Sequence, residues 1–270
     1  MNFIDKVRDA SLRNNSLVCV GLDPDLNKIP SQFRNQENAL FRFNKCIIDT
    51  TSNAVCAFKP QIAYYAGVGG EKDLELTIDY IHSNYPHIPV ILDSKRGDIG
   101  STAEIYAKEA FDRYNADAVT VNPYLGGDAL KPFLDRNNKG IIILCRTSNP
   151  GAKDIQDLEC KGKRVFQIIA EKAVHEWNYN KNVLLVVGAT YPEELREIRI
   201  IAGTMPFLVP GIGAQGGDIK QAVVNGISED GMGMIINSSR SIIYAGKDNN
   251  FAKQAYLATC SLRDHINQYR

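Results

Sequence analysis

Short apolar segments recur along the whole chain, and each is separated from the next by a stretch long enough to hold a helix. Eight such segments lie near residues 16–22, 54–59, 88–93, 117–122, 140–146, 183–188, 206–210 and 232–237. Most of them are continuously apolar rather than alternating, as in Val183-Leu-Leu-Val-Val187. Continuous apolar segments are typical of parallel strands that are covered on both faces, so the pattern predicts a parallel sheet.

The stretches between these strands show helical periodicity. It is clearest over residues 101–113, where apolar side chains recur three and four positions apart and Ser101 and Glu104 have the spacing of a capping box. Further helices are predicted over residues 218–226 and about 250–268. Eight strand-helix units in roughly 250 residues predict a (β/α)8 barrel, and an open doubly wound sheet is the alternative.

The length of 270 residues suits one large α/β unit, and no proline-rich or serine-rich linker divides the sequence. We therefore expect a single (β/α)8 barrel domain over residues 1–270. The 31 basic residues balance the 31 acidic ones, and the pI is about 6.9. Without an overall basic field, no nucleic-acid or membrane partner is expected.

No apolar segment approaches the length of a membrane-spanning helix, and Asp5, Lys6 and Arg8 interrupt the first residues. The cysteines are scattered along the chain, at Cys19, Cys46, Cys56, Cys145, Cys160 and Cys260. They show neither a C-x-x-C pair nor the spacing of metal ligands. Several of them, such as Cys19 and Cys145, lie inside apolar segments, which suits small buried thiols in a reducing compartment. We expect a soluble, cytoplasmic protein.

Charged residues follow the first three predicted strands, at Asp23, Lys59, Asp93, Lys95 and Asp98. In a parallel barrel these strand ends form the face that carries the chemistry. Asp93 and Lys95 are two positions apart, so their side chains are expected to leave the same face and meet. Each residue alone fits a solvated loop charge or an ordinary ion pair. Together they favour an alternating network of charges that holds a proton donor in place.

Glycine-rich sequence follows the seventh strand and includes Gly211, Gly213 and Gln215, and Arg240 follows the eighth strand. Glycines let backbone N–H groups approach an anion, and an arginine can bind phosphate oxygens with two donors. A glycine-rich loop alone fits a tight turn equally well. Because loops seven and eight are where barrels commonly bind phosphate, the combination with Arg240 predicts a phosphate site.

The remaining reactive side chains predict little chemistry. Cys145 lies near the end of the fifth strand, but no histidine occupies a comparable position, so we interpret it as a core residue. The histidines have no metal-ligand spacing, and no metal site is predicted. Trp177 lies among apolar residues with helical spacing and is expected to pack in the core.

The segment Asp93-Ser-Lys95-Arg-Gly-Asp98 resembles the D-x-K-x-x-D signature of the orotidine 5'-phosphate decarboxylase family. Other strand-end segments resemble that family's motifs in the same order: Gly21-Leu-Asp23, Phe58-Lys59-Pro60-Gln61, Thr147-Ser148-Asn-Pro150-Gly151, Pro210-Gly-Ile-Gly213-Ala-Gln215-Gly216 and Ser239-Arg240. The resemblance covers nearly the whole chain. It is greatest to the longer bacterial branch, because Gly100-Ser101 precede Thr102 where the commoner branch has Pro-Asn.

This resemblance implies a homodimeric (β/α)8 barrel that converts orotidine 5'-monophosphate to uridine 5'-monophosphate and carbon dioxide without metal or organic cofactor. It also implies the roles of the residues at the reacting centre. Lys95 would be the proton donor and Asp93 would face the substrate's departing carboxylate. Asp98 and Thr102 would complete the ribose site of the neighbouring subunit.

The same resemblance implies the substrate contacts. Asp23 and Lys59 match positions that contact the ribose and complete the charge network. Ser148 matches a serine that reads the pyrimidine. The phosphate clamp would comprise Gln215 and Arg240, with Gly211 and Gly213 in the same loops. The stretch from Asn149 to about Gly162 departs from shorter relatives, so its lid geometry is not transferred.

Two other functions stay open. Metal-using keto-sugar-phosphate decarboxylases and hexulose-phosphate synthases share the D-x-K-x-x-D pattern, but they carry an acidic residue where this chain has Lys59. A barrel that only binds a phosphorylated metabolite is the other alternative. The Asp93, Lys95 and Asp98 set argues against it, because a binding protein needs no proton donor between carboxylates.

Overall fold

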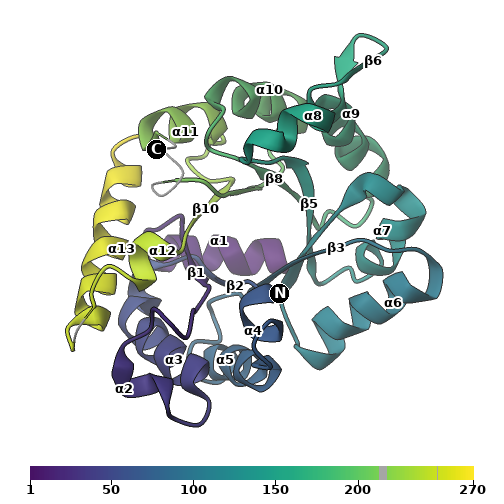
Figure 1. Ribbon diagram of the computed structural model, residues 1–270. Helices are drawn as coiled ribbons and strands as arrows, with labels where there is room; N and C mark the ends of the chain where they lie inside the picture. The colour runs from purple at the N-terminus through teal and green to yellow at the C-terminus, as the bar shows by residue number, and fades with distance from the viewer. Residues whose placement is uncertain (213–217, 248) are drawn as a thin grey trace.

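The strands lie at the centre of the computed structural model, which describes residues 1–212, 218–247 and 249–270 (Figure 1). Within these residues an eight-stranded parallel sheet has the order β2-β1-β10-β9-β8-β5-β4-β3. The strands are β1 Val18–Leu22, β2 Ala57–Pro60, β3 Ile91–Arg96, β4 Ala118–Val121, β5 Gly140–Arg146, β8 Val183–Val187, β9 Phe207–Val209 and β10 Met234–Ser238. Parallel bridges from Phe58 to Val90 and from Gln61 to Asp93 connect β2 to β3 and close the barrel. The predicted fold is confirmed, and the open sheet is excluded.

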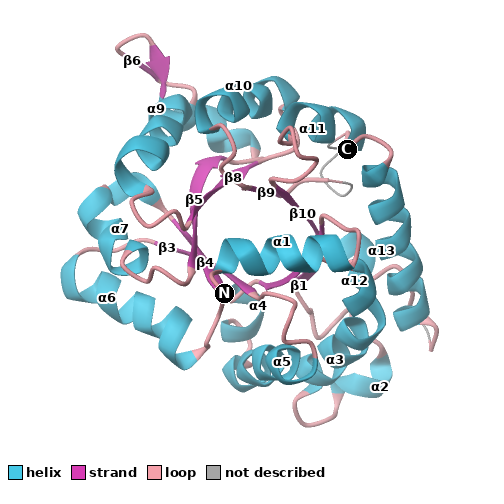
Figure 2. Ribbon diagram, turned by 180° about the vertical axis from the view of Figure 1, so that it is seen from behind, coloured by secondary structure: helices cyan, strands magenta, loops and turns pink. Residues whose placement is uncertain are grey.

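Helices surround the strands in both views (Figures 1 and 2). The α-helices of the described residues are α1 Phe3–Arg13, α2 Ser31–Arg34, α3 Ala39–Thr51, α4 Ala63–Ala66, α5 Glu71–Asn84, α6 Gly100–Lys108, α7 Gly127–Leu134, α8 Lys153–Gln156, α9 Val165–Lys172, α10 Pro192–Ala202, α11 Ile219–Gly226, α12 Arg240–Ile243 and α13 Phe251–Asn267. All of them except α1 lie outside the ring of strands. The stretch after β5 holds α8 and a small antiparallel hairpin, β6 Glu159–Cys160 and β7 Lys163–Arg164, which projects from the barrel. None of the helices in the described ranges has the length and apolar character needed to cross a membrane.

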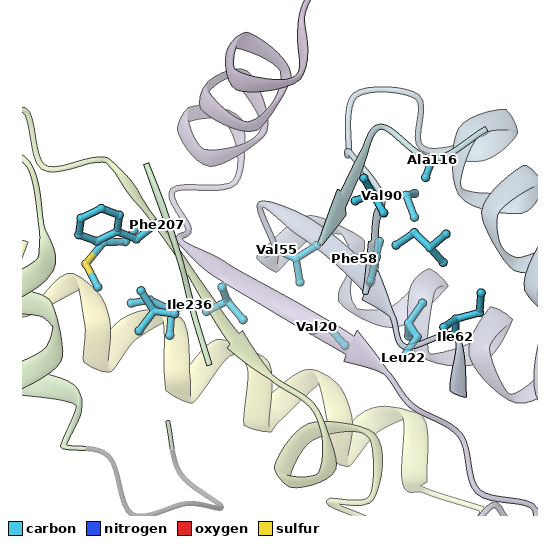
Figure 3. Packing of buried hydrophobic residues seen from close by; sticks show 14 of the residues in the cluster. Val20, Leu22, Val55, Phe58, Ile62, Val90, Ala116, Phe207 and Ile236 are labelled. Carbon is cyan, nitrogen blue, oxygen red and sulfur yellow. The ribbon is translucent and has the colours of Figure 1, made fainter. Parts of the chain in front are cut away.

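Two apolar clusters explain the continuous strand pattern. Side chains such as Val20, Phe58 and Ile236 belong to the larger cluster, in which the strands pack against the helices (Figure 3). Neighbouring positions such as Cys19 and Ala57 belong to a second, inner cluster that includes at least one residue from each of the eight barrel strands. Because both faces of each strand are buried, the strands need apolar residues at consecutive positions.

Helix α1, which the sequence analysis did not predict, crosses one end of the barrel (Figure 2). Its Phe3 and Val7 join the inner cluster. A Cβ atom at Gly140 would lie 2.2 Å from the Phe3 ring, so the glycine at the start of β5 leaves room for this aromatic side chain. The helix therefore closes the end of the barrel opposite the carboxyl ends of the strands.

Two predicted helices are confirmed, and one predicted cap is wrong. Asp218 caps α11 by accepting a 3.0 Å hydrogen bond from the backbone N–H of Gln221, and α13 spans the predicted terminal helix. The capping box at Ser101 does not form, because α6 already begins at Gly100 and has Ile99 at its N-cap. Ser101 therefore lies in the first turn, where its side chain is past the capping position.

The predictions for the core side chains are confirmed. Cys145 is 1% exposed, and its Sγ donates to the carbonyl oxygen of Phe166 at 3.2 Å. Trp177 is buried in the larger apolar cluster. Cys19 and Cys56 are also buried, whereas Cys160 on the projecting hairpin is exposed. Burial raises the pKa of the Cys145 thiol, which keeps it protonated and unreactive near neutral pH.

Candidate active site

At the carboxyl ends of β2 and β3, Lys59 and Lys95 both contact the carboxylate of Asp93. Lys59 Nζ donates to Asp93 Oδ2 at 3.0 Å, and Lys95 Nζ donates to Asp93 Oδ1 at 2.6 Å. Lys59 and Asp93 are almost completely buried, whereas the Lys95 side chain is 45% exposed. Thr120 on β4 completes the set, since its hydroxyl donates to Asp93 Oδ1 at 2.9 Å. One carboxylate is thus held by three side-chain donors.

The end of β3 is irregular where it carries Lys95. The pairing of β3 with β4 shifts register between Leu92 and Arg96, and Lys95 has a positive φ of 49°. The backbone N–H groups of Ser94 and Lys95 both donate to Thr120 Oγ1 at 2.9 Å. Asp93 and Lys95 therefore meet as predicted, but through a bulged strand end rather than through regular alternation. Backbone strain of this kind costs about 1–3 kcal/mol and persists where the surroundings fix it.

The charges in this network stabilise one another. Burial alone would raise the pKa of Asp93, but the ammonium groups of Lys59 and Lys95 outweigh it and hold that pKa well below its usual range. Burial alone would lower the pKa of Lys59, but the carboxylates of Asp93 and Asp23 outweigh it and raise that pKa. Lys59 and Asp93 are therefore both ionised near neutral pH.

A cavity of about 510 Å³ opens beside this network. Its charged side is formed by Asp23, Lys59, Asp93 and Lys95. Its other walls come from the strand-five loop and from apolar strand residues, namely Thr147, Ser148, Asn149, Gln156, Leu144, Val186, Leu208 and Pro210. The volume is within the range of small-molecule sites.

A second cavity of about 330 Å³ adjoins the first, and Asp23, Asp93, Pro210 and Asn237 line both. Arg240, at the start of α12, lines this second cavity together with Gly211, whose φ is +99°. Such a backbone conformation favours glycine. The two cavities therefore form one space at the mouth of the barrel. The charged side chains of Asp93, Lys59 and Lys95 lie near its centre, and Arg240 lies in the smaller cavity.

The structure brings most of the predicted site residues to these cavities. Ser148 lines the larger cavity, and Arg240 and Gly211 line the smaller one. Asp98 and Thr102 are not among the described residues that line either cavity. The Asp98 carboxylate accepts from the backbone N–H of Ile99 at 2.8 Å, and Thr102 is exposed on α6. Gln215 and Gly213 lie outside the described residues.

Three residues of the site were given no role by the sequence analysis. Thr120 holds Asp93, and Gln156 lines the larger cavity beside Thr147. Arg146, the last residue of β5, is fully buried behind Gln156. Two of these residues carried a signal in the sequence: Thr120 is a hydroxyl residue inside the apolar segment of β4, and Arg146 is a basic residue at the end of a buried strand.

In the part of the chain that the structure describes, no group of three or more His, Cys, Asp or Glu side chains is arranged to hold a metal ion.

The barrel and the network at its mouth define a (β/α)8-barrel enzyme site. The profile of the orotidine 5'-phosphate decarboxylase / HUMPS family matches residues 16–255. Relatives named orotidine 5'-phosphate decarboxylase include that of Ralstonia nicotianae, 55% identical over 270 residues, and that of Cellvibrio japonicus, 55% identical over 272 residues. In both comparisons the match covers 100% of each chain.

Solved structures agree with the sequence relatives. The Leishmania donovani OMP decarboxylase has a TM-score of 0.85 and 37% identity, and the match covers 100% of this chain and 98% of that one. Leishmania donovani UMP synthase has a TM-score of 0.88 and 39% identity, with 56% of its chain covered. The chain belongs to the orotidine 5'-phosphate decarboxylase / HUMPS family, and its full-length relatives place it in the decarboxylase branch.

Proposed function

We propose that this chain converts orotidine 5'-monophosphate to uridine 5'-monophosphate and carbon dioxide, a step in the synthesis of pyrimidine nucleotides. The observation that carries the proposal is the pair of lysines on the buried carboxylate of Asp93, next to a cavity of nucleotide-binding size. It occurs in a chain whose full-length relatives are named for this reaction. The roles of the individual site residues are likewise proposed.

Decarboxylation breaks the bond between C6 of the pyrimidine and its carboxylate, and carbon dioxide departs without the bonding electrons. The electron pair stays on C6 in the plane of the ring, where the ring carbonyls delocalise it poorly. The Lys95 ammonium stabilises this charge and then transfers a proton to C6, which gives the product and a neutral amine. A proton from water restores the ammonium, so the overall reaction consumes one proton.

Asp93 and Lys59 fix the electrostatics around Lys95. The two lysines and Thr120 keep the Asp93 carboxylate ionised and in place. Its negative charge lies next to the proposed position of the substrate's carboxylate. The repulsion between the two carboxylates disfavours the charged substrate relative to the departing carbon dioxide. Lys59 is held by Asp93 and by the charge of Asp23, and it serves as a fixed positive charge and ribose contact.

The two adjoining cavities suit the parts of a nucleotide. The base lies in the larger cavity against Ser148, with the ribose near Asp23. The phosphate lies in the smaller cavity, where Arg240 binds it with two donors and Gly211 allows the backbone to approach. Gln215 and Gly213 complete this phosphate clamp. Binding energy from the phosphate, which does not react, contributes to the stabilisation of the transition state.

We further propose a homodimer in which Asp98 and Thr102 complete the partner's ribose site. Neither residue lines a cavity of its own chain among those described. The surface that carries them also exposes large apolar side chains, since Ile99 is 59% exposed and Ile105 is 60% exposed. Tyr124, which follows the neighbouring strand β4, is 80% exposed. Exposed apolar groups of this kind are typical of a surface that another subunit covers.

The alternative functions are less well supported. Lys59 occupies the strand-two position that is acidic in metal-using relatives, and its ammonium would repel a divalent cation. A barrel that only binds a metabolite would not need a half-exposed ammonium held against a carboxylate.

All six cysteines are free thiols, which fits the cytoplasm as the proposed location.

An ultraviolet assay of the chelator-treated protein with orotidine 5'-monophosphate tests the proposal. We expect rapid loss of the substrate chromophore without added metal. A parallel assay offers a keto-sugar phosphate with a divalent cation. Turnover only in that parallel assay would assign the chain to the metal-using relatives. Tight binding of uridine 5'-monophosphate without turnover in either assay would identify a binding protein.

A further inference from the structure

Arg146 is a charged residue buried within the barrel wall, with a side chain that is 0% exposed. Its guanidinium pairs with the carboxylates of Asp157 at 3.3 Å and Glu194 at 3.7 Å. It also lies 4.5 Å from the centre of the Tyr191 ring and 5.6 Å from that of Phe166. A buried charge is costly unless it is paired, so these contacts, from the C-cap of α8, from α9, and from α10 and its N-cap, fix the guanidinium in one place.

Gln156 connects this buried charge to the wall of the larger cavity. Its Oε1 accepts from Arg146 Nη1 at 3.4 Å and from the backbone N–H of Thr147 at 2.9 Å. Its Nε2 donates to Thr147 Oγ1 at 2.9 Å. Gln156 and Thr147 both line the larger cavity, whereas Arg146 is not among its described lining residues. The side-chain amide of Gln156 therefore joins the two ends of the loop from Thr147 to Gln156, and Arg146 orients that amide.

Ser148 lies within the loop that this amide closes. On its other side it packs directly on the end of β8, because a Cβ atom at Gly188 would lie 2.9 Å from Ser148 Cβ and 3.0 Å from its backbone nitrogen. The side-chain amide of Gln156 holds the residue before Ser148 through both the backbone and the hydroxyl of Thr147. The position of Ser148 is thus determined by β8 on one side and by Gln156 on the other.

We propose that Gln156 and Arg146 are positioning residues that set where Ser148 meets the base of the bound nucleotide. Gln156 acts on the loop directly, and Arg146 acts through Gln156 and Asp157. This inference rests on the proposed function, because it assigns the base to the larger cavity. It predicts that substitution of either residue weakens the binding of a ligand that carries the pyrimidine and leaves the affinity for ribose phosphate almost unchanged.

The test compares the binding of uridine 5'-monophosphate with that of ribose 5-phosphate by titration calorimetry. Gln156→Leu removes the amide at similar size, and Gln156→Glu keeps an acceptor for Arg146 and for the Thr147 N–H. We expect Gln156→Leu to weaken uridine 5'-monophosphate about tenfold, which is the effect of losing one good hydrogen bond, and to leave ribose 5-phosphate unchanged. Gln156→Glu should restore part of the loss. Arg146→Lys should show the same selective loss as Gln156→Leu.

Gln167→Leu is the matched control. Gln167 also makes two side-chain hydrogen bonds, to the Arg164 N–H and to Glu197, but it lies on α9 and does not line either cavity. We expect it to change neither affinity. Equal weakening of both ligands by Gln156→Leu, or no weakening, would overturn the positioning role while the wild type still binds the nucleotide. A wild type that binds no uridine 5'-monophosphate would instead overturn the proposed function.

Discussion

The ammonium of Lys59 lies 3.0 Å from the carboxylate of Asp93, and the two side chains are only 5% and 11% exposed. Burial of both charges is costly, and their mutual attraction is strong because water is excluded. Lys95 approaches the other oxygen of the same carboxylate from the cavity side. The buried Lys59–Asp93 ion pair therefore fixes the carboxylate that holds the half-exposed ammonium of Lys95 in place.

Removal of the charge of Asp93 should destabilise the protein. Asp93→Asn leaves the buried Lys59 ammonium without its ion-pair partner, and we expect the free energy of unfolding to fall by about 3–5 kcal/mol. Urea denaturation followed by circular dichroism measures this change. The control is Asp112→Asn, which breaks the exposed ion pair with Arg136 and should change stability little. Equal effects of the two substitutions would contradict the account.

The same ion pair predicts the pH dependence of stability. The pKa of Asp93 is held below its ordinary value of 3.8, so its contribution to stability is complete above that pH and is lost as the pH falls further. The pKa of Lys59 is raised above 10.5, so its contribution is complete below that pH and is lost in stronger base.

The unfolding free energies of the wild type and Asp93→Asn should therefore differ by a constant amount between about pH 5 and pH 9 and converge in acid. Urea denaturation across this range measures the difference. Convergence that is already complete at about pH 5 would show that the carboxylate is not held ionised by the lysines.

A shared active site can be tested by mixing two inactive variants. In the proposed dimer each site combines Lys95 of one subunit with Asp98 of the other. A heterodimer of Lys95→Ala and Asp98→Asn then has one site with both defects and one intact site. Random reassortment should restore about one quarter of the wild-type activity, since half the dimers are mixed and half their sites are intact. Activity that stays at the level of the separate variants after exchange would place Asp98 in its own chain's site or outside the site.

The sequence alone was enough to predict the barrel, because burial on both faces of every strand leaves a continuous apolar segment that is easy to recognise. It also predicted that Asp93 and Lys95 would meet. The reason given was wrong in detail, since the two residues are joined across a bulge that depends on Thr120 of the next strand. A one-dimensional pattern does not show which polar residue of a neighbouring strand will receive two backbone N–H groups.

Helix α1 and the Arg146 cluster show a second limit. Helix α1 packs across the end of the barrel through Phe3, and the space for that ring depends on Gly140, far away in the sequence. The charge of the buried Arg146 is paired with Asp157 and Glu194, which come from two other segments of the chain. Both features follow from tertiary packing, which local propensity does not encode.

The most direct test of the account is the turnover of orotidine 5'-monophosphate by Lys95→Ala, measured together with its affinity for uridine 5'-monophosphate. Lys95 is half exposed, so the variant should fold normally and bind the product within a few-fold of the wild type. We predict that kcat falls by at least about 10³-fold, because both the charge stabilisation and the proton donor are removed. A variant that retains wild-type turnover would contradict the assignment of Lys95 as the proton donor.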